Sequence, residues 1–133
     1  MKQRDFKNEV DMKGYIDLFL LPVPKKELAA YKKLAAKFSK IIQEHGALEY
    51  REFLGDDLNP KHGTPFPSKI KLKPGEVLVS SVIEFRSKAH RDQVNKKAMA
   101  DPRMQQMCKE ELPFDVKRML YGGFSTIVKM KTT

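Results

Sequence analysis

The stretch YIDLFLLPV at residues 15–23 decides the fold, together with EVLVSSVIEF at residues 76–85. In an extended strand successive side chains point to opposite sides, and both sides of these two strands are largely apolar. Each strand leads into a helix rich in lysine or arginine, and two helices can cover only one side of a sheet. We therefore expect a second copy of the chain to bury the other side. The apolar residues expected there are Phe19, Leu78, Val82, Phe124 and Val128.

Helical spacing of apolar residues between positions 28 and 42 predicts a helix after the prolines at positions 22 and 24. Gly46 is suited to end that helix, because glycine readily adopts the left-handed backbone of a C-cap. Ser87 and Asp101 are suited to begin two further helices as N-caps. The sequence thus predicts helices up to about residue 44, over 88–100 and over 103–109.

The remaining strands are expected over residues 47–54 and 120–131, which gives the order β-α-β-β-α-β. This order is typical of the α+β class with a ferredoxin-like, split βαβ antiparallel sheet and helices on one face. Two such sheets docked through their open faces form a dimeric α+β barrel. We expect one domain over residues 14–133, preceded by a polar N-terminal arm at 1–13.

Residues 55–73 form the longest irregular stretch, and a loop of this length in a compact domain is usually functional or contains a missed element. The sequence Lys73-Pro74-Gly75-Glu76 has proline and glycine at the central positions of a type II turn. A short strand over residues 69–72, paired with the start of the strand at 76–85, is therefore expected.

Composition limits the compartment and the partners. The chain has 133 residues, a formal net charge of +9 and one cysteine, Cys108, so an intrachain disulfide is impossible. We expect a cytoplasmic protein without a signal peptide or membrane span, because no apolar run approaches about 18 residues. The positive charge makes a polyanion such as nucleic acid a candidate partner, although a solvated surface explains most of the lysines.

Several blocks of sequence, taken in order, resemble one family. They are GALEYRE at 46–52, GDD at 55–57, GTPFP at 63–67, AHRD at 89–92, DPRM at 101–104, PFD at 113–115 and YGGF at 121–124. Together they are similar to the YbaA-like family of uncharacterised bacterial proteins (domain of unknown function 1428), over about residues 14–130. The resemblance implies a dimeric ferredoxin-like α+β barrel and no established activity or catalytic residue.

Candidate ligand-binding residues are polar side chains near the expected ends and faces of the sheet. On the strand at 47–54, Glu49 and Arg51 share one side while Tyr50 and Glu52 share the other. Whichever pair points between sheet and helices supplies a charged group to an apolar pocket and needs partners there. The candidates are Glu49, Arg51, His62, Arg91, Arg103, Asp115, Arg118 and Tyr121. No metal and no cofactor are expected, because no ligand spacing or phosphate-binding loop is present.

Two classes of function compete on this evidence. The first is a homodimer that encloses a small organic molecule between sheet and helices, as a binding protein or as a cofactor-free enzyme similar to the monooxygenases and isomerases of this architecture. The second is RNA binding, which the charge and the strand order favour. The strand at 76–85 lacks the aromatic pattern of an RNA-recognition motif, so we rank RNA binding below the small-molecule dimer.

Overall fold

The computed structural model describes residues 14–131, in which four strands form one antiparallel sheet. The strands are β1 (Tyr15–Pro24), β2 (Glu49–Leu54), β3 (Glu76–Phe85) and β4 (Leu120–Ser125). Their order across the sheet is β2-β3-β1-β4, so the two long apolar strands lie at the centre. The predicted ferredoxin-like, split βαβ arrangement is confirmed.

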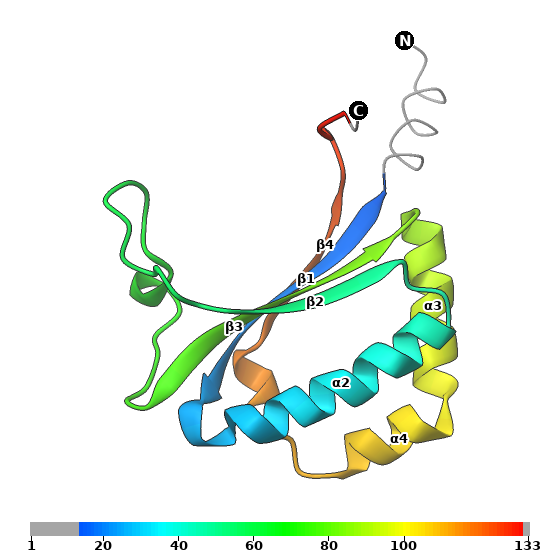
Figure 1. The fold of residues 1–133 in the computed structure, drawn as a ribbon, viewed down its shortest axis with the longest axis horizontal. Coiled ribbons are helices and arrows are strands. Elements are labelled where there is room, and N and C mark those ends of the chain that lie inside the picture. The colour runs from blue at the N-terminus through cyan, green and yellow to red at the C-terminus, as the bar shows by residue number, and fades with distance from the viewer. Residues whose placement is uncertain (1–13, 132–133) are drawn as a thin grey trace.

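The α-helices within residues 14–131 lie on one side of this sheet, as Figure 1 shows. They are α2 (Leu28–Glu44), α3 (Lys88–Ala100) and α4 (Pro102–Lys109). Short 3-10 turns cover 25–27, 66–68 and 116–118. The predicted caps are confirmed: Gly46 has φ +110° after α2, Ser87 Oγ accepts from the His90 N–H at 3.1 Å, and Asp101 Oδ1 accepts from the Arg103 N–H at 2.9 Å.

The strand register shows which residues face the helices. Phe19 pairs with Ser81 of β3 and with Tyr121 of β4, and all three lie on the helix side with Asp17 and Leu21. The expectation that Phe19 lies on the open side of the sheet was therefore wrong. Alternation grouped it correctly with Asp17 and Leu21, but both sides of β1 are apolar, so hydrophobicity alone did not say which side meets the helices.

The side of the sheet opposite α2, α3 and α4 carries Val82 and Phe124, as expected. Leu18 lies between them, opposite Val82 on one neighbouring strand and Gly122 on the other. Phe124 is 51% exposed and Leu120 is 53% exposed, whereas Leu78 is buried. An apolar surface thus runs across the centre of this side; we call it the open face, made of Ile16, Leu18, Leu20, Val82, Leu120 and Phe124.

Two predicted strands are shorter or absent. β4 ends at Ser125 instead of residue 131, because its partner β1 begins at Tyr15, opposite Ser125. Val128 therefore lies beyond the strand. Residues 69–72 form no strand, and the Lys71 carbonyl instead accepts a hydrogen bond from Arg118 Nη2 at 2.8 Å. The turn at 73–76 is confirmed, with the Glu76 N–H donating to the Lys73 carbonyl. The expected arm at 1–13 lies outside the described residues.

Candidate functional site

A cleft of about 200 Å³ lies between the helix side of the sheet and helices α2 and α4. Its walls are almost entirely apolar and come from every layer of the fold. The aromatic lining residues are Phe19, Tyr31, Phe38, Tyr50 and Phe114, and the sulfur-containing ones are Met104, Met107, Cys108 and Met119. A concave apolar site with few polar groups is the usual form of a small-molecule pocket.

Glu52 supplies the carboxylate of this cleft. Its Oε1 accepts from the Tyr31 hydroxyl at 2.7 Å and from the Ser81 hydroxyl at 2.6 Å. Its Oε2 accepts from the Tyr50 hydroxyl. Three neutral donors from α2, β2 and β3 therefore orient one carboxylate, which we call the Glu52 cluster.

The strand register explains why these groups meet. Glu52 of β2 lies directly opposite Ser81 of β3, and Ser81 lies opposite Phe19 of β1. Directly opposed residues in an antiparallel sheet share a face and are close neighbours. Tyr31 reaches the same point from above, because it lies on the buried stripe of α2. The cluster is thus fixed by regular secondary structure rather than by a loop.

Burial raises the pKa of Tyr31 and of Tyr50 above the ordinary tyrosine value, and the hydrogen bond of each phenol to Glu52 raises it further. An adjacent carboxylate has this effect because it opposes a second negative charge. Both phenols consequently stay protonated at neutral pH. They serve as hydrogen-bond donors, and the carboxylate is the acceptor of the cluster.

A second carboxylate lies on the same side of the sheet, at Asp17, which is only 1% exposed. Arg91 Nη1 donates to Asp17 Oδ1 at 2.6 Å, and the Tyr121 hydroxyl donates to the same oxygen at 3.1 Å. Asn95 contributes a longer bond to Oδ2. Of the predicted candidates, Arg91 and Tyr121 are therefore brought together, with their side chains 3.0 Å apart.

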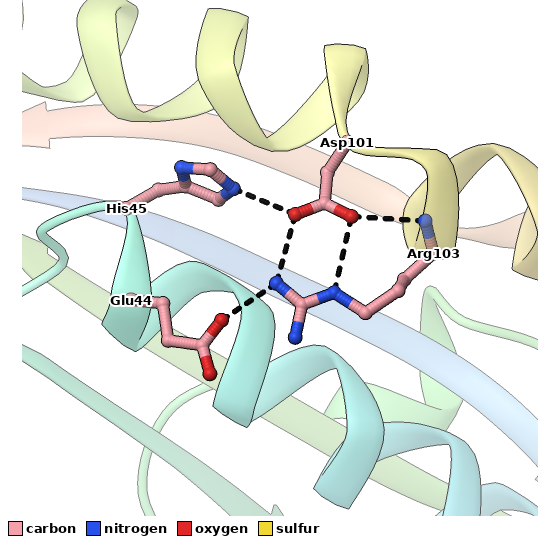
Figure 2. Close-up of polar contacts among 4 residues, drawn as sticks. All are labelled: Glu44, His45, Asp101 and Arg103. Carbon is pink, nitrogen blue, oxygen red and sulfur yellow. Dashed lines mark hydrogen bonds and ion pairs between the residues drawn. The ribbon is translucent and has the colours of Figure 1, made fainter.

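Arg103 belongs to a third polar cluster, at the surface (Figure 2). Its guanidinium donates to both oxygens of Asp101 and to Glu44 Oε2, while His45 Nε2 lies 2.8 Å from Asp101 Oδ2. Hydrogen bonds from Arg103 and His45 hold the pKa of Asp101 well below its usual range. These contacts join the end of α2 to the start of α4.

Asp115 and Arg118 line a wider surface groove of about 820 Å³ between α2 and the segment at 110–118. Arg118 is paired there with Glu76 at 2.5 Å, and Asp115 accepts from the Lys117 N–H at 3.0 Å. Charged side chains of both signs surround the groove. Its two candidate residues are thus already engaged within the chain.

The remaining candidates lie elsewhere. Glu49 and Arg51 point to the open face, where the Arg51 guanidinium lies 4.8 Å from the centre of the Phe53 ring. His62 is exposed in the long loop. None of the eight candidates lines the cleft. Tyr50 and Glu52 of its polar cluster were one of the two pairs weighed on that strand but were not named as candidates, and Tyr31 and Ser81 were missed. The alternation along the strand showed that Tyr50 and Glu52 share one side of the sheet, but it did not show on which side the helices pack.

Within residues 14–131 no three His, Cys, Asp or Glu side chains gather as a metal-binding group. In the same part of the chain no helix combines the length and hydropathy that crossing a membrane requires.

Comparisons with known proteins agree with this architecture. The chain is 41% identical over 114 residues to the "Uncharacterized protein YbaA" of Escherichia coli K12 and equally to that of Shigella flexneri, covering 86% of this chain and 97% of each relative. A crystal structure of a nipsnap family protein of unknown function from Agrobacterium tumefaciens superposes with a TM-score of 0.56 at 17% identity, covering 86% of this chain and 89% of that one.

A dimeric ferredoxin-like protein from an uncultured marine organism gives a TM-score of 0.51 at 12% identity, covering 95% of this chain and 98% of its own. Likenesses at these identities establish the fold alone. The family model described as "Protein of unknown function (DUF1428)" matches residues 14–116, so the resemblance found in the sequence is confirmed. The match and the 41% identity together show that this chain belongs to the DUF1428 family.

Proposed function

We propose that this protein is a homodimer that binds a small organic molecule in the cleft between its sheet and its helices. The observation that supports the proposal is the Glu52 cluster, an oriented carboxylate inside an otherwise apolar cavity of about 200 Å³. Polar groups held rigidly among apolar walls fix the orientation of a ligand, while the walls supply affinity. A cavity of about 150 Å³ already accepts benzene, so the cleft has room for one ring with a short substituent.

Filling the cleft tests the binding part of the proposal. Ala35 of α2 lines the cleft, whereas Ala29 lies on the exposed side of the same helix. Ligand-observed NMR with toluene, benzyl alcohol and indole should give saturation transfer with the wild type and with Ala29→Trp. The signals should disappear with Ala35→Trp, provided that its thermal unfolding matches that of Ala29→Trp. Equal signals from both variants would show that these molecules bind outside the cleft.

The open face supports the dimer. Its apolar residues lie on the two central strands and on β4, and within residues 14–131 no helix covers them (Figure 1). Large contiguous apolar patches on a soluble chain usually mark an interface. A related fold, the marine ferredoxin-like protein, is described as dimeric. A two-fold axis that lies between the two sheets, next to Val82 and Leu18, would place the same surface on both partners, as closed dimers require.

Light scattering on a sizing column tests the interface. Val82→Asp places a charge at the centre of the open face and should yield a folded monomer, or an insoluble chain. Met99→Asp provides the matched control, because Met99 is exposed on α3, away from that face. A Val82→Asp dimer with wild-type affinity would assign the interface to another surface.

The enzyme alternative rests on the same carboxylate. In the cleft, Glu52 is the acidic group, and its phenol neighbours are held neutral by their raised pKa values. Any proton taken from a bound molecule would go to Glu52 as the general base. Turnover of a bound ligand that is lost in Glu52→Gln, with binding retained, would establish this alternative.

A further inference from the structure

The charge of the Glu52 cluster points to the chemistry of the ligand. Each hydrogen bond that Glu52 accepts comes from a neutral hydroxyl: Tyr31, Ser81 and Tyr50. Within residues 14–131, no Lys, Arg or His nitrogen lies within 4.0 Å of the Glu52 carboxylate as an ion-pair partner. A carboxylate at an apolar surface is stabilised most by a cation, and these three donors supply none.

The Glu52 carboxylate also has a hydrogen-bond acceptor position that the cluster does not use. Two carboxylate oxygens offer about four acceptor positions. Oε1 accepts two hydroxyls and Oε2 accepts one, so a further position on Oε2 is open to a ligand donor. Tyr31 and Tyr50 lie on either side of the carboxylate as fixed donors. An incoming N–H group would therefore meet an oriented acceptor.

The walls of the cleft suit a positive charge as well. Five aromatic rings line it, and four of them form two edge-to-face pairs: Tyr31 with Phe114 at 5.7 Å and Phe38 with Tyr50 at 5.4 Å between centroids. The face of an aromatic ring carries negative electrostatic potential and attracts ammonium groups. Methionines on α4 add polarizable, apolar contacts for the rest of a ligand. Carboxylate and rings together form a setting for an organic cation.

We propose that the cleft binds a small organic ammonium ion, with the ammonium group on Glu52 and the apolar part against the aromatic and methionine walls. The inference rests on the proposed function, since it names the class of ligand for the same cavity. A carboxylate-bearing ligand is disfavoured by repulsion from Glu52. A neutral ligand gains the apolar contacts but leaves the charge of Glu52 uncompensated.

Three phenyl compounds of similar size and different charge test the proposal: benzylammonium, benzyl alcohol and benzoate, titrated by calorimetry at neutral pH. With the wild type, benzylammonium should bind about tenfold more tightly than benzyl alcohol, and benzoate should bind most weakly, because a charge-assisted hydrogen bond contributes more than a neutral one. This ranking needs no variant, so it holds as a test even where a substitution impairs folding.

Glu52→Gln removes the charge and keeps the shape. It should reduce benzylammonium affinity about tenfold and leave benzyl alcohol affinity within about twofold. Glu49→Gln is the matched control, because it makes the same substitution on the same strand but faces the other side of the sheet. It should change neither affinity.

The outcomes separate the two proposals. Equal binding of all three probes, or an unchanged benzylammonium affinity in Glu52→Gln, overturns the ammonium ligand but not small-molecule binding, whose location the Ala35→Trp variant tests. Binding of benzyl alcohol alone has the same meaning. Failure of all three probes to bind at millimolar concentration overturns both the ammonium ligand and the small-molecule function.

Discussion

Two carboxylates lie on the helix side of the same sheet, and they have different hydrogen-bond partners. Asp17 is fully buried and is paired with the guanidinium of Arg91 at 2.6 Å. Glu52 lies at the wall of a cleft and is held by three hydroxyls. The difference is that the cation of Asp17 comes from the chain itself, whereas Glu52 receives only neutral donors, and this difference is the basis of the proposed ammonium site.

The largest effect is expected from removing the cation of the first carboxylate. Arg91→Met leaves the charge of Asp17 buried without its partner, and breaking a buried pair in this way costs about 3 to 5 kcal/mol of unfolding free energy. Urea denaturation measures the loss. Arg86→Met, at an exposed arginine just before α3, should change little.

A second substitution shows whether the charge is the cause. Replacing both partners, as in Asp17→Leu with Arg91→Met, should recover part of the lost stability, because no unpaired charge then remains. A double variant less stable than Arg91→Met alone would mean that the packing of Arg91 over the Tyr15 ring, 5.0 Å from its centre, is the larger contribution.

The Glu52 cluster should affect the pH dependence of the unfolding free energy at alkaline pH. The pKa of Tyr31 and of Tyr50 is raised by burial and by Glu52, whereas unfolded tyrosines ionise near pH 10. The unfolded chain then binds fewer protons than the folded one, so this contribution to stability is complete below about pH 10 and declines as the pH rises further.

Urea denaturation between about pH 8 and about pH 11 measures that decline. Lysines titrate in the same range, so the informative quantity is the difference between wild type and the double variant Tyr31→Phe with Tyr50→Phe. The variant should lose stability less steeply with pH. Identical slopes would contradict the raised pKa values.

Removing one hydroxyl from each carboxylate should have a smaller effect on the unfolding free energy. Tyr50→Phe removes the hydroxyl that donates to Glu52 Oε2 and should cost about 1 kcal/mol of unfolding free energy. Tyr121→Phe should cost less, because Asp17 Oδ1 keeps its bond from Arg91. The reverse order in thermal or urea unfolding would show that Tyr121, which stacks on Phe19 at 4.6 Å, contributes mainly through its ring.

The smallest effect on stability is expected from Glu52→Gln, within about 0.5 kcal/mol of the wild type. The amide oxygen can accept from Tyr31 and Ser81, and the amide nitrogen can donate to the Tyr50 hydroxyl, which then acts as acceptor. Asp17→Asn should cost more in the same urea experiment, because it leaves Arg91 without its buried partner. Equal losses would remove the distinction between a structural and an available carboxylate.

Much of the fold could be predicted because its signals are local. Alternation along residues 15–23 and 76–85 indicated strands, helical spacing indicated α2, and Ser87 and Asp101 marked helix starts through their own backbone contacts. The strand expected to reach residue 131 ended at Ser125 because pairing depends on how far β1 extends. The length of β4 therefore depends on a strand far away in the sequence and cannot be read from residues 120–131 alone.

The Glu52 cluster likewise depends partly on local sequence and partly on contacts between distant residues. The sequence by itself determined that Tyr50 and Glu52 share one side of β2, because side chains alternate along any strand. Only the tertiary structure decided that this side faces α2, that Ser81 lies opposite Glu52, and that Arg91 reaches Asp17 instead. The physical reason is that both sides of β1 and β3 are apolar, so hydrophobicity permits the helices on either side. The choice between them is made by packing contacts between residues far apart in the chain.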